Sequence, residues 1–328
     1  MRITLIGPGK MPIPPKDFGG VESLMWDYHN ELIDRGHQVT IVNTEDLEGA
    51  VETVNSSNPD FVHLHYDAYA HIMPHIKCKS RAVTSHYPYL ENPESQYAWI
   101  LNDFALLSEH ENIGIISLSD GIAEAFVNAG ATPESSHVIP CAINTELFTF
   151  DSKAEIPDRS IYLAKIEPRK RQHMFQHADF NIDFAGPIAD NRFHHQNKNY
   201  IGVLPKQEIY DTLTRWANLV LLSDGEGHAR VCLEGMAAGL GLVVSEQATA
   251  NLDTSKPFID VVPQGKINDR EFVKQTIEKN RKASCSMREE IRSYCIDEFG
   301  WDSIIKKYEK AIASICSNAL TASTRREL

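Results

Sequence analysis

The sequence predicts an α/β protein of two units with mainly parallel sheets. Short apolar strand candidates alternate with longer helix candidates along the whole chain, and this alternation is typical of β-α-β folds. The chain has 328 residues, which is long for one compact core and comfortable for two domains. Residues 149–158 are polar and unperiodic, so we interpret them as the linker between the two units.

The strand candidates of the first half are apolar runs at residues 2–6, 38–43, 60–66, 81–85, 113–118 and 137–140. The helix candidates between them are 20–36, 47–56, 95–108 and 120–129. In the second half the strand candidates are 159–164, 180–185, 199–203, 218–222, 241–244 and 258–261. The helix candidates there are 206–216, 229–238, 269–281, 285–297 and 301–317.

The composition is that of a soluble globular protein, with 42% hydrophobic and 23% charged residues. No apolar run approaches the ~20 residues that span a bilayer. A strand candidate starts almost at the first residue, so we expect no signal peptide. The six cysteines form no C-x-x-C pair, and we expect reduced thiols and a cytoplasmic location.

The net charge of −13 is unevenly placed. Residues 1–150 hold 7 Lys and Arg against 20 Asp and Glu, whereas residues 151–328 hold 25 of each sign. An acidic half would repel nucleic acid and an anionic bilayer. We therefore expect no nucleic-acid partner and no stable membrane association, although solubility alone would also explain the charge.

Residues 223–244 are the most informative segment. They follow an apolar strand candidate and comprise a Gly-punctuated turn, an apolar helix and another apolar strand. Such a turn is a natural phosphate site, because free N–H groups and the helix dipole point at the ligand. Glu226 and Glu234 bracket the turn and the start of the helix. Carboxylates suit hydroxyl-rich partners such as a ribose or a sugar ring, so the segment predicts a nucleotide-sugar ligand.

Cations follow the first strand of the second half. Lys165, Arg169 and Lys170 lie on the loop after residues 159–164. In open α/β sheets ligands bind at the carboxyl ends of strands, and cations there suit a diphosphate. A solvated basic turn is the alternative interpretation.

The loop after the first strand of the chain is rich in glycine and proline. It is not a G-x-G-x-x-G motif, because position 12 is Pro, so a dinucleotide site is unsupported. Gly19 and Gly20 instead open the first long helix candidate. Glycine there allows an anion to approach the helix N-terminus closely, and a plain glycine-rich loop is the alternative.

Several motifs follow one another along nearly the whole chain. They are Gly-Gly-x-Glu at 19–22, Leu-x-x-Arg-Gly-His-x-Val-Thr at 32–40, Val-Ile-Pro-x-x-x-Asn at 138–144, Ala-Lys-Ile-Glu-Pro-Arg-Lys at 164–170 and Glu-x7-Glu at 226–234. In order and spacing the chain resembles the retaining glycosyltransferases of the GT-B fold, specifically family 4, the "glycosyl transferases group 1" class.

The resemblance implies two Rossmann-like domains with parallel sheets facing across a cleft. Residues 1–150 would form the acceptor-binding domain and residues 151–300 the nucleotide-sugar-binding domain. A helix at 301–318 would cross back to the first domain, and residues 319–328 would be a frayed tail.

The resemblance also assigns roles to the charged residues. Glu226 would bind hydroxyls of the donor sugar and Glu234 the ribose diol, whereas two exposed helix-cap glutamates are the alternative. Lys165 and Lys170 would neutralise the donor diphosphate. Arg169 would take over if the loop is shifted by one residue.

Further site residues follow from the same resemblance. Gly20 would present its N–H to the diphosphate, and His86 would face the transferred sugar from a strand end, where a structural histidine is the alternative. Gly202 and Val203 would line the nucleobase pocket. The catalytic candidates are Glu226, His86, Lys170 and Lys165. The remaining donor-binding candidates are Gly19, Gly186, Gly227, His228, Ala229 and Arg230.

The chain departs from the family pattern at a few positions. Ala164 stands where Gly is usual, and Lys165 stands where Arg is usual, which keeps the charge but loses the bidentate fork. His228 and Arg230 would add positive character beside the donor and tune the choice of donor.

The activity implied is transfer of a sugar from a nucleoside diphosphate, UDP or GDP, to a hydroxyl of a soluble saccharide or glycan. No cofactor and no metal are expected. His63, His65 and Asp67 could be drawn as a metal site, but two histidines without a clear third ligand are weak evidence. A GT-B sugar-nucleotide epimerase and a degenerate, non-catalytic nucleotide-sugar-binding subunit remain the alternatives.

Overall fold

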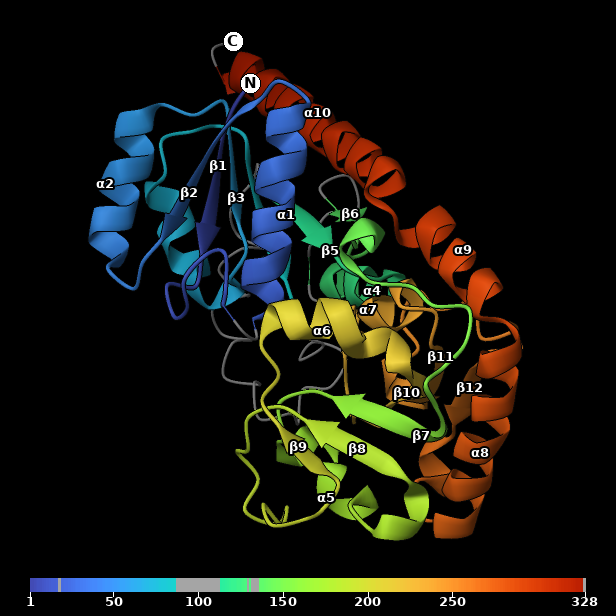
Figure 1. Cartoon of the computed structure of the whole chain (residues 1–328). Helices are drawn as coiled ribbons and strands as arrows, with labels where there is room; N and C mark the ends of the chain where they lie inside the picture. Colours follow the sequence, from blue (N-terminus) through green and yellow to red (C-terminus); the bar gives the residue numbers. More distant parts are fainter. Residues whose placement is uncertain (17–18, 87–112, 129, 131–135, 327–328) are drawn as a thin grey trace. The chain divides into compact units, whose positions relative to one another are not determined.

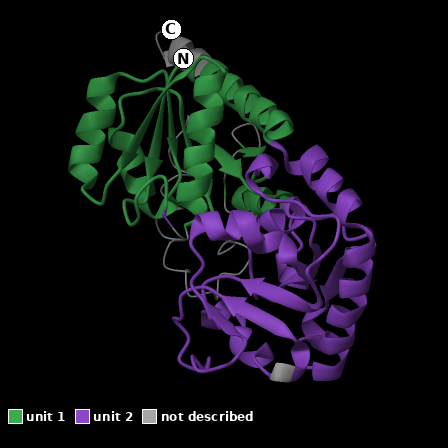
Figure 2. Ribbon diagram, viewed as in Figure 1, with its two compact units in different colours: residues 1–15, 19–141, 301–328 green, residues 16–18, 142–300 purple. Residues whose placement is uncertain are grey.

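The structure is a computed structural model that describes residues 1–16, 19–86, 113–128, 130 and 136–326 (Figure 1). The helix expected at 95–108 lies outside the described residues. The chain divides into two compact units (Figure 2). Unit 1 comprises Met1–Pro15, Gly19–Cys141 and Trp301–Leu328, and unit 2 comprises Lys16–Phe18 and Ala142–Gly300.

Unit 1 contains a parallel sheet whose described strands lie in the order β2-β1-β3-β4-β5-β6. The strands are β1 (Arg2–Gly7), β2 (Gln38–Asn43), β3 (Phe61–Leu64), β4 (Arg81–Ser85), β5 (Ile113–Ser117) and β6 (Ser136–Val138). The order reverses between β1 and β3, and the crevice at such a switch point is where open α/β sheets bind ligands. The strands expected in the first half are confirmed to within a few residues.

Unit 1 has helices that pack on its sheet and a long C-terminal helix. They are α1 (Gly20–Asp34), α2 (Leu47–Ser57), α4 (Asp120–Asn128) and α10 (Trp301–Arg326). α1 packs on β1 and β2 and against α10. The ring of Tyr28 in α1 lies 4.5 Å from that of Tyr308 and 4.9 Å from that of Trp301, both in α10. Aromatic contacts of this kind attach the end of the chain to its first domain.

Unit 2 contains a second parallel sheet, and its described strands lie in the order β12-β11-β10-β7-β8-β9. The strands are β7 (Ile156–Leu163), β8 (Ile182–Ala185), β9 (Tyr200–Gly202), β10 (Trp216–Leu221), β11 (Gly241–Ser245) and β12 (Ile259–Val262). This is the doubly wound nucleotide-binding order, with the switch point between β7 and β10. The α/β prediction with parallel sheets is confirmed in both units.

The helices of unit 2 are α5 (Gln172–Phe175), α6 (Lys206–Thr212), α7 (Arg230–Ala237), α8 (Arg270–Ser286) and α9 (Arg288–Phe299). α7 packs on β10, β11 and α9, and α8 covers β7, β10, β11 and β12. Strands β10 and β11 are buried along their whole length, as expected for parallel strands covered on both faces.

Some expected boundaries differ from the structure. The unit boundary falls after Cys141 rather than after residue 150, because residues 142–150 bond to the second unit. Ile143 N donates to Phe299 O at 3.0 Å, and Thr149 N donates to Tyr210 O at 2.9 Å. The supposed linker at 149–158 already contains the start of β7.

The last helix also runs further than expected. α10 continues to Arg326 instead of ending at residue 318. Residues 319–326 contain Ala, Leu and Arg, which favour helices, and neither Gly nor Pro, so nothing in their sequence stops the helix.

Candidate functional site

The candidate site lies at the carboxyl edge of the unit 2 sheet, at its switch point. Residues 164–171 follow β7, and residues 222–229 follow β10 and lead into α7. The two loops are bonded to one another, since Asp224 N donates to Arg169 O at 3.0 Å. The buried side chain of Tyr162 in β7 is bonded to both loops. Its hydroxyl accepts from Leu222 N at 2.8 Å and donates to Lys170 O. The sheet therefore holds the predicted cation loop against the predicted carboxylate loop.

Glu226 is the centre of this cluster. Its Oε1 lies 2.5 Å from Lys170 Nζ and 3.1 Å from Arg169 Nη1. Burial raises the pKa of Glu226, but the two cations outweigh burial and hold the pKa below its usual range. The side chain is 12% exposed. Glu226 is therefore an ionised acceptor with fixed orientation, which suits the binding of a hydroxyl group.

Arg169 and Lys165 differ in their surroundings although they share a loop. The guanidinium of Arg169 donates to Glu226, to Ser223 Oγ at 3.1 Å, to Gly225 O and to Glu167 Oε1 at 3.0 Å. Its side chain is 10% exposed. Lys165 is 51% exposed and lies 3.7 Å from Glu167 Oε2. Arg169 therefore holds the carboxylate loop together, whereas the ammonium of Lys165 is exposed to solvent.

The second carboxylate of the Glu-x7-Glu motif has a partner of its own. Glu234 lies in α7, and its Oε1 is 2.6 Å from the Nζ of Lys206, the first residue of α6. Both side chains are largely buried. The two carboxylates of the motif are thus each ion-paired with a different lysine.

The backbone conformation favours glycine at two neighbouring strand ends, Gly186 and Gly202. A Cβ on Gly186, which has φ +139°, would lie 2.1 Å from Ala164 O. Gly186 N donates to Gly202 O at 2.9 Å, so these strand ends are joined. Gly202 has φ +94°, which favours glycine, and a Cβ there would meet nothing within 4 Å. Val203, next in the chain, exposes 45% of its surface.

The turn that leads into α7 contains the remaining candidates. Gly227, His228 and Ala229 precede the first helical residue, Arg230. Burial lowers the pKa of His228 to about 3, and its ring lies 5.4 Å from that of Phe299. The expectation that His228 adds positive charge is therefore wrong, because a buried imidazole stays neutral at physiological pH. Arg230 Nη1 donates to Ala142 O at 3.3 Å.

Three of the predicted site residues belong to unit 1. Gly19 and Gly20 stand at the N-terminus of α1, and a Cβ on Gly20 would meet nothing within 4 Å. His86 follows β4, and its Nε2 lies 3.4 Å from His65 Nδ1. Burial lowers the pKa of His86 to about 4, so this imidazole is neutral at physiological pH.

His63 is bonded through both ring nitrogens, to Tyr308 Oη at 2.8 Å and to Thr84 Oγ1 at 2.7 Å. A histidine used in this way has no ring nitrogen left for a metal. Within the described residues, no group of three or more His, Cys, Asp or Glu side chains is arranged to hold a metal ion. The expectation of a metal-free site remains a prediction.

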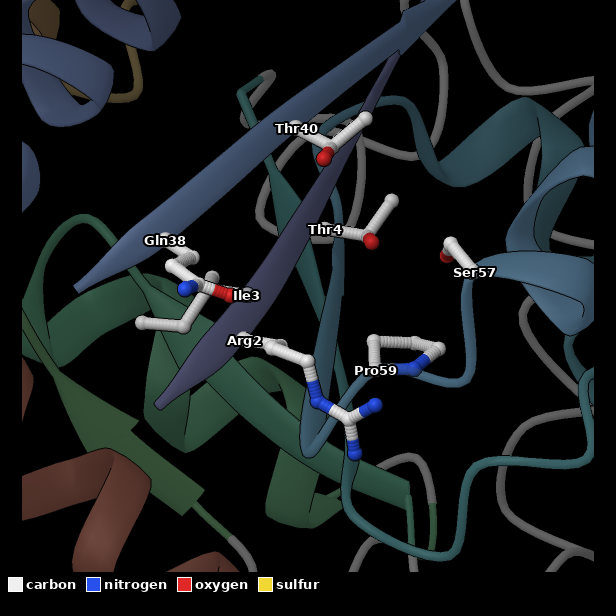
Figure 3. Close-up of a pocket in the computed structure, with 7 residues that line it drawn as sticks. All are labelled: Arg2, Ile3, Thr4, Gln38, Thr40, Ser57 and Pro59. Atoms are coloured by element: carbon white, nitrogen blue, oxygen red, sulfur yellow. The ribbon is translucent and has the colours of Figure 1, made fainter.

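Unit 1 also contains a small pocket of about 150 Å³ (Figure 3). It is lined by Arg2, Ile3, Thr4, Gln38, Thr40, Ser57 and Pro59. It lies at the amino ends of β1 and β2, away from the carboxyl edge where α/β sheets bind ligands. We therefore assign it no role.

In unit 2 the structure brings together Lys170, Arg169 and Glu226, and it places Lys165 on the same loop. Sequence reasoning missed Glu167 and Ser223, which hold Arg169, and Lys206, which binds Glu234. The position of Lys206, just after the strand-end residues Gly202 and Val203, was the available signal.

Comparisons with known proteins agree with this architecture. No family model and no curated protein matches the sequence. Among solved structures, AviGT4, a glycosyltransferase involved in avilamycin A biosynthesis, is 15% identical over 96% of this chain and 98% of its own, with a TM-score of 0.71. Sucrose-phosphate synthase from Thermosynechococcus elongatus is 14% identical over 96% and 99%, with a TM-score of 0.76. HepE of Anabaena in complex with UDP-glucose is 14% identical over 100% of both chains, with a TM-score of 0.68.

At such low identity the likeness establishes the fold. The chain has the two-domain α/β fold of the GT-B glycosyltransferases, as its sequence predicts. In the part of the chain that the structure describes, no helix is both long enough and apolar enough to cross a membrane.

Proposed function

We propose that this protein is a retaining glycosyltransferase. It moves a sugar from a nucleoside diphosphate, UDP or GDP, to a hydroxyl of a soluble saccharide or glycan. The observation that carries the proposal is the cluster at the switch point of unit 2, where ionised Glu226 lies 2.5 Å from Lys170 at the carboxyl edge of a doubly wound parallel sheet. One edge therefore offers a hydroxyl acceptor and a phosphate-binding cation side by side.

The chemistry follows from the placement of these charges. Lys170 and Lys165 bind the diphosphate and stabilise the negative charge that develops as it leaves. Glu226 accepts hydrogen bonds from hydroxyls of the donor sugar and fixes its orientation. The acceptor attacks on the face from which the diphosphate departs, through an oxocarbenium-like state, and the departing phosphate takes the acceptor's proton. The new glycosidic bond then keeps the anomeric configuration.

Arg169 serves this chemistry without touching the donor. It holds Glu226 and the backbone of Gly225 in place, and its charge adds to that of Lys170 in keeping the Glu226 carboxylate ionised. Of the predicted cations, Arg169 is therefore a positioning residue, whereas Lys165 and Lys170 contact the phosphates.

The solved neighbours support the proposal through what their names state. AviGT4 is a glycosyltransferase, and HepE forms complexes with UDP and with UDP-glucose. UDP-sugars are therefore the first donors to test on this chain.

The acceptor assignment rests on charge. The excess negative charge lies in residues 1–150, which form most of unit 1, so an anionic membrane surface is an unfavourable partner. We propose that the enzyme works in the cytoplasm on a soluble glycan. Binding to vesicles with anionic lipid at physiological salt would contradict this part of the proposal.

The test is a thermal-stability screen with UDP-, GDP-, ADP- and TDP-sugars. Wild type is compared with Glu226→Gln, which keeps the shape of the side chain but loses its charge, and with Lys282→Met, a change at an exposed residue of α8. We expect one nucleotide class to raise the Tm of wild type and of Lys282→Met, and its sugar conjugate to lose its added effect in Glu226→Gln.

The same screen, followed by transfer and epimerisation assays with the nucleotide-sugar that stabilises the protein, separates the alternatives. An absence of stabilisation by every nucleotide would refute the donor site. Stabilisation without transfer to any glycan would favour a non-catalytic binding subunit. Conversion of the donor to its epimer with no acceptor present would favour a sugar-nucleotide epimerase.

A further inference from the structure

The hydroxyl of Tyr162 is a buried polar group that the proposed chemistry does not use directly. Tyr162 is the second last residue of β7 and is 0% exposed. Its ring stacks on that of Phe184 in β8, with the ring centres 5.9 Å apart. Burial raises the pKa of Tyr162, so the hydroxyl keeps its proton and can both donate and accept hydrogen bonds.

This hydroxyl uses both abilities to join the two loops of the site. It accepts from Leu222 N at 2.8 Å, where the carboxylate loop begins, and it donates to the carbonyl of Lys170 in the cation loop. The guanidinium of Arg171 adds a second link, from Nη1 to Leu222 O at 3.4 Å. The backbone of Lys170 is therefore tied to the sheet through one tyrosine side chain.

The carbonyl of Lys170 lies at a turn that decides where the lysine side chain starts. The next residue, Arg171, has φ +58°, in the left-handed region, which costs free energy in a residue other than glycine and persists where the surroundings hold it. Lys170 N donates to Glu167 O at 2.9 Å, and Lys170 Nζ lies 2.5 Å from Glu226 Oε1. Lys170 is thus held at its N–H, at its carbonyl and at its ammonium, and Tyr162 holds the carbonyl.

We infer that Tyr162 is a positioning residue for the donor diphosphate, because its hydroxyl fixes the backbone of Lys170 and with it the ammonium that binds the phosphates. This inference rests on the proposed function. A lysine has a flexible four-carbon stem, so its ammonium is placed accurately only if the backbone beneath it is fixed by neighbouring hydrogen bonds. Without the hydroxyl, the carbonyl of Lys170 and the N–H of Leu222 lose a buried partner.

The experiment is a double-mutant cycle that measures the dissociation constants of UDP and GDP by calorimetry. The proteins are wild type, Tyr162→Phe, Lys170→Met and the double variant. Bare nucleotides are used because Glu226, on the other loop bonded to Tyr162, is expected to contact only the sugar.

We expect Tyr162→Phe to bind the preferred nucleotide about fivefold more weakly, which is comparable with the net contribution of one hydrogen bond. Lys170→Met should bind it at least about tenfold more weakly. The double variant should match Lys170→Met to within about twofold, because residues that act through one another give non-additive effects. A merely structural role of Tyr162 would instead give additive effects.

Tyr308→Phe is the matched control, because it also removes a buried tyrosine hydroxyl, which in unit 1 bonds to His63 at 2.8 Å. It should leave both dissociation constants unchanged. The Tm of every variant shows whether it is folded at the temperature of the titration. If Tyr162→Phe is not, trimethylamine N-oxide, which favours the folded state, is added to all five proteins at one concentration.

The outcomes separate this inference from the function on which it rests. Additive effects in the double variant, an equal loss of affinity in Tyr308→Phe, or wild-type affinity in Tyr162→Phe beside weak binding by Lys170→Met would overturn the role of Tyr162 and leave the proposed function standing. Equal affinities of wild type and Lys170→Met, or binding of neither nucleotide to wild type, refute the diphosphate site itself, and the inference falls with it.

Discussion

Arg169 and Lys165 carry the same charge on the same loop, but the structure predicts opposite consequences of removing them. Arg169 is 10% exposed and donates to Glu226, Ser223, Gly225 and Glu167. Arg169→Met leaves two carboxylates and a carbonyl in a buried cluster without this partner, which costs about 3 kcal/mol of stability. Lys165 is 51% exposed and 3.7 Å from its carboxylate, so Lys165→Met should cost about 0.5 kcal/mol or less.

The assay is denaturant-induced unfolding of both variants, followed by titration with the nucleoside diphosphate that stabilises wild type. Arg169→Met should unfold at a clearly lower denaturant concentration. Lys165→Met should unfold like wild type and bind the nucleotide about tenfold less tightly, since it loses a charge-assisted contact to phosphate. Lys282→Met serves as the surface control for both measurements.

The reasoning is refuted if the two variants exchange behaviour. A large stability loss in Lys165→Met would mean that Lys165 holds the loop. Normal stability in Arg169→Met with lost nucleotide binding would mean that Arg169 contacts the phosphates directly.

Three further predictions concern the framework of the site. Burial lowers the pKa of His228 to about 3, below the ordinary value of about 6.5. Between these two pH values the imidazole binds a proton in the unfolded chain but not in the folded one. Stability is then lost as the pH falls from about 6.5 towards 3, and His228→Gln should lessen the loss between about pH 7 and 5 by about 2 kcal/mol in denaturant titrations; an unchanged loss would contradict the assignment. Buried Arg288 donates to the carbonyls of residues 151, 214, 216 and 238, so Arg288→Met should lower stability by about 3 kcal/mol or more, whereas a cost below about 1 kcal/mol would show that these bonds matter little. Gly186→Ala places a Cβ 2.1 Å from a carbonyl oxygen, whereas Gly20→Ala meets open space, so a Tm measurement should show a large loss only in the former; equal losses would contradict the geometry of these loops.

Much of the fold could be predicted because its strands are buried on both faces. Residues 218–222 and 241–244 are continuous apolar runs in the sequence, and they form β10 and β11 as expected. The boundary between the units was harder to place. Residues 149–158 look polar and irregular and put the expected boundary at residue 150, yet Ile143 and Phe148 before them are buried in unit 2, and such packing depends on partners far away in the chain.

The site could be predicted in part. Lys170 and Glu226 each follow a strand candidate and Glu234 lies in the helix that comes next, which indicated one edge of one sheet, and the contact between Lys170 and Glu226 agrees with this expectation. The roles within the cluster could not be predicted, because they depend on burial. Arg169 proves to be buried and Lys165 exposed, and sequence alone does not distinguish two cations of one loop.

The most direct test of the account is the affinity of the preferred nucleoside diphosphate for wild type, Lys170→Met and Glu226→Gln, measured by calorimetry with and without the sugar attached. The account predicts that Lys170→Met binds the nucleotide at least about tenfold more weakly, because it loses a charged contact to the diphosphate. It also predicts that Glu226→Gln binds the bare nucleotide normally and loses only the contribution of the sugar. Equal affinities of all three proteins for the nucleotide and for its sugar conjugate would contradict the placement of the donor in this cluster.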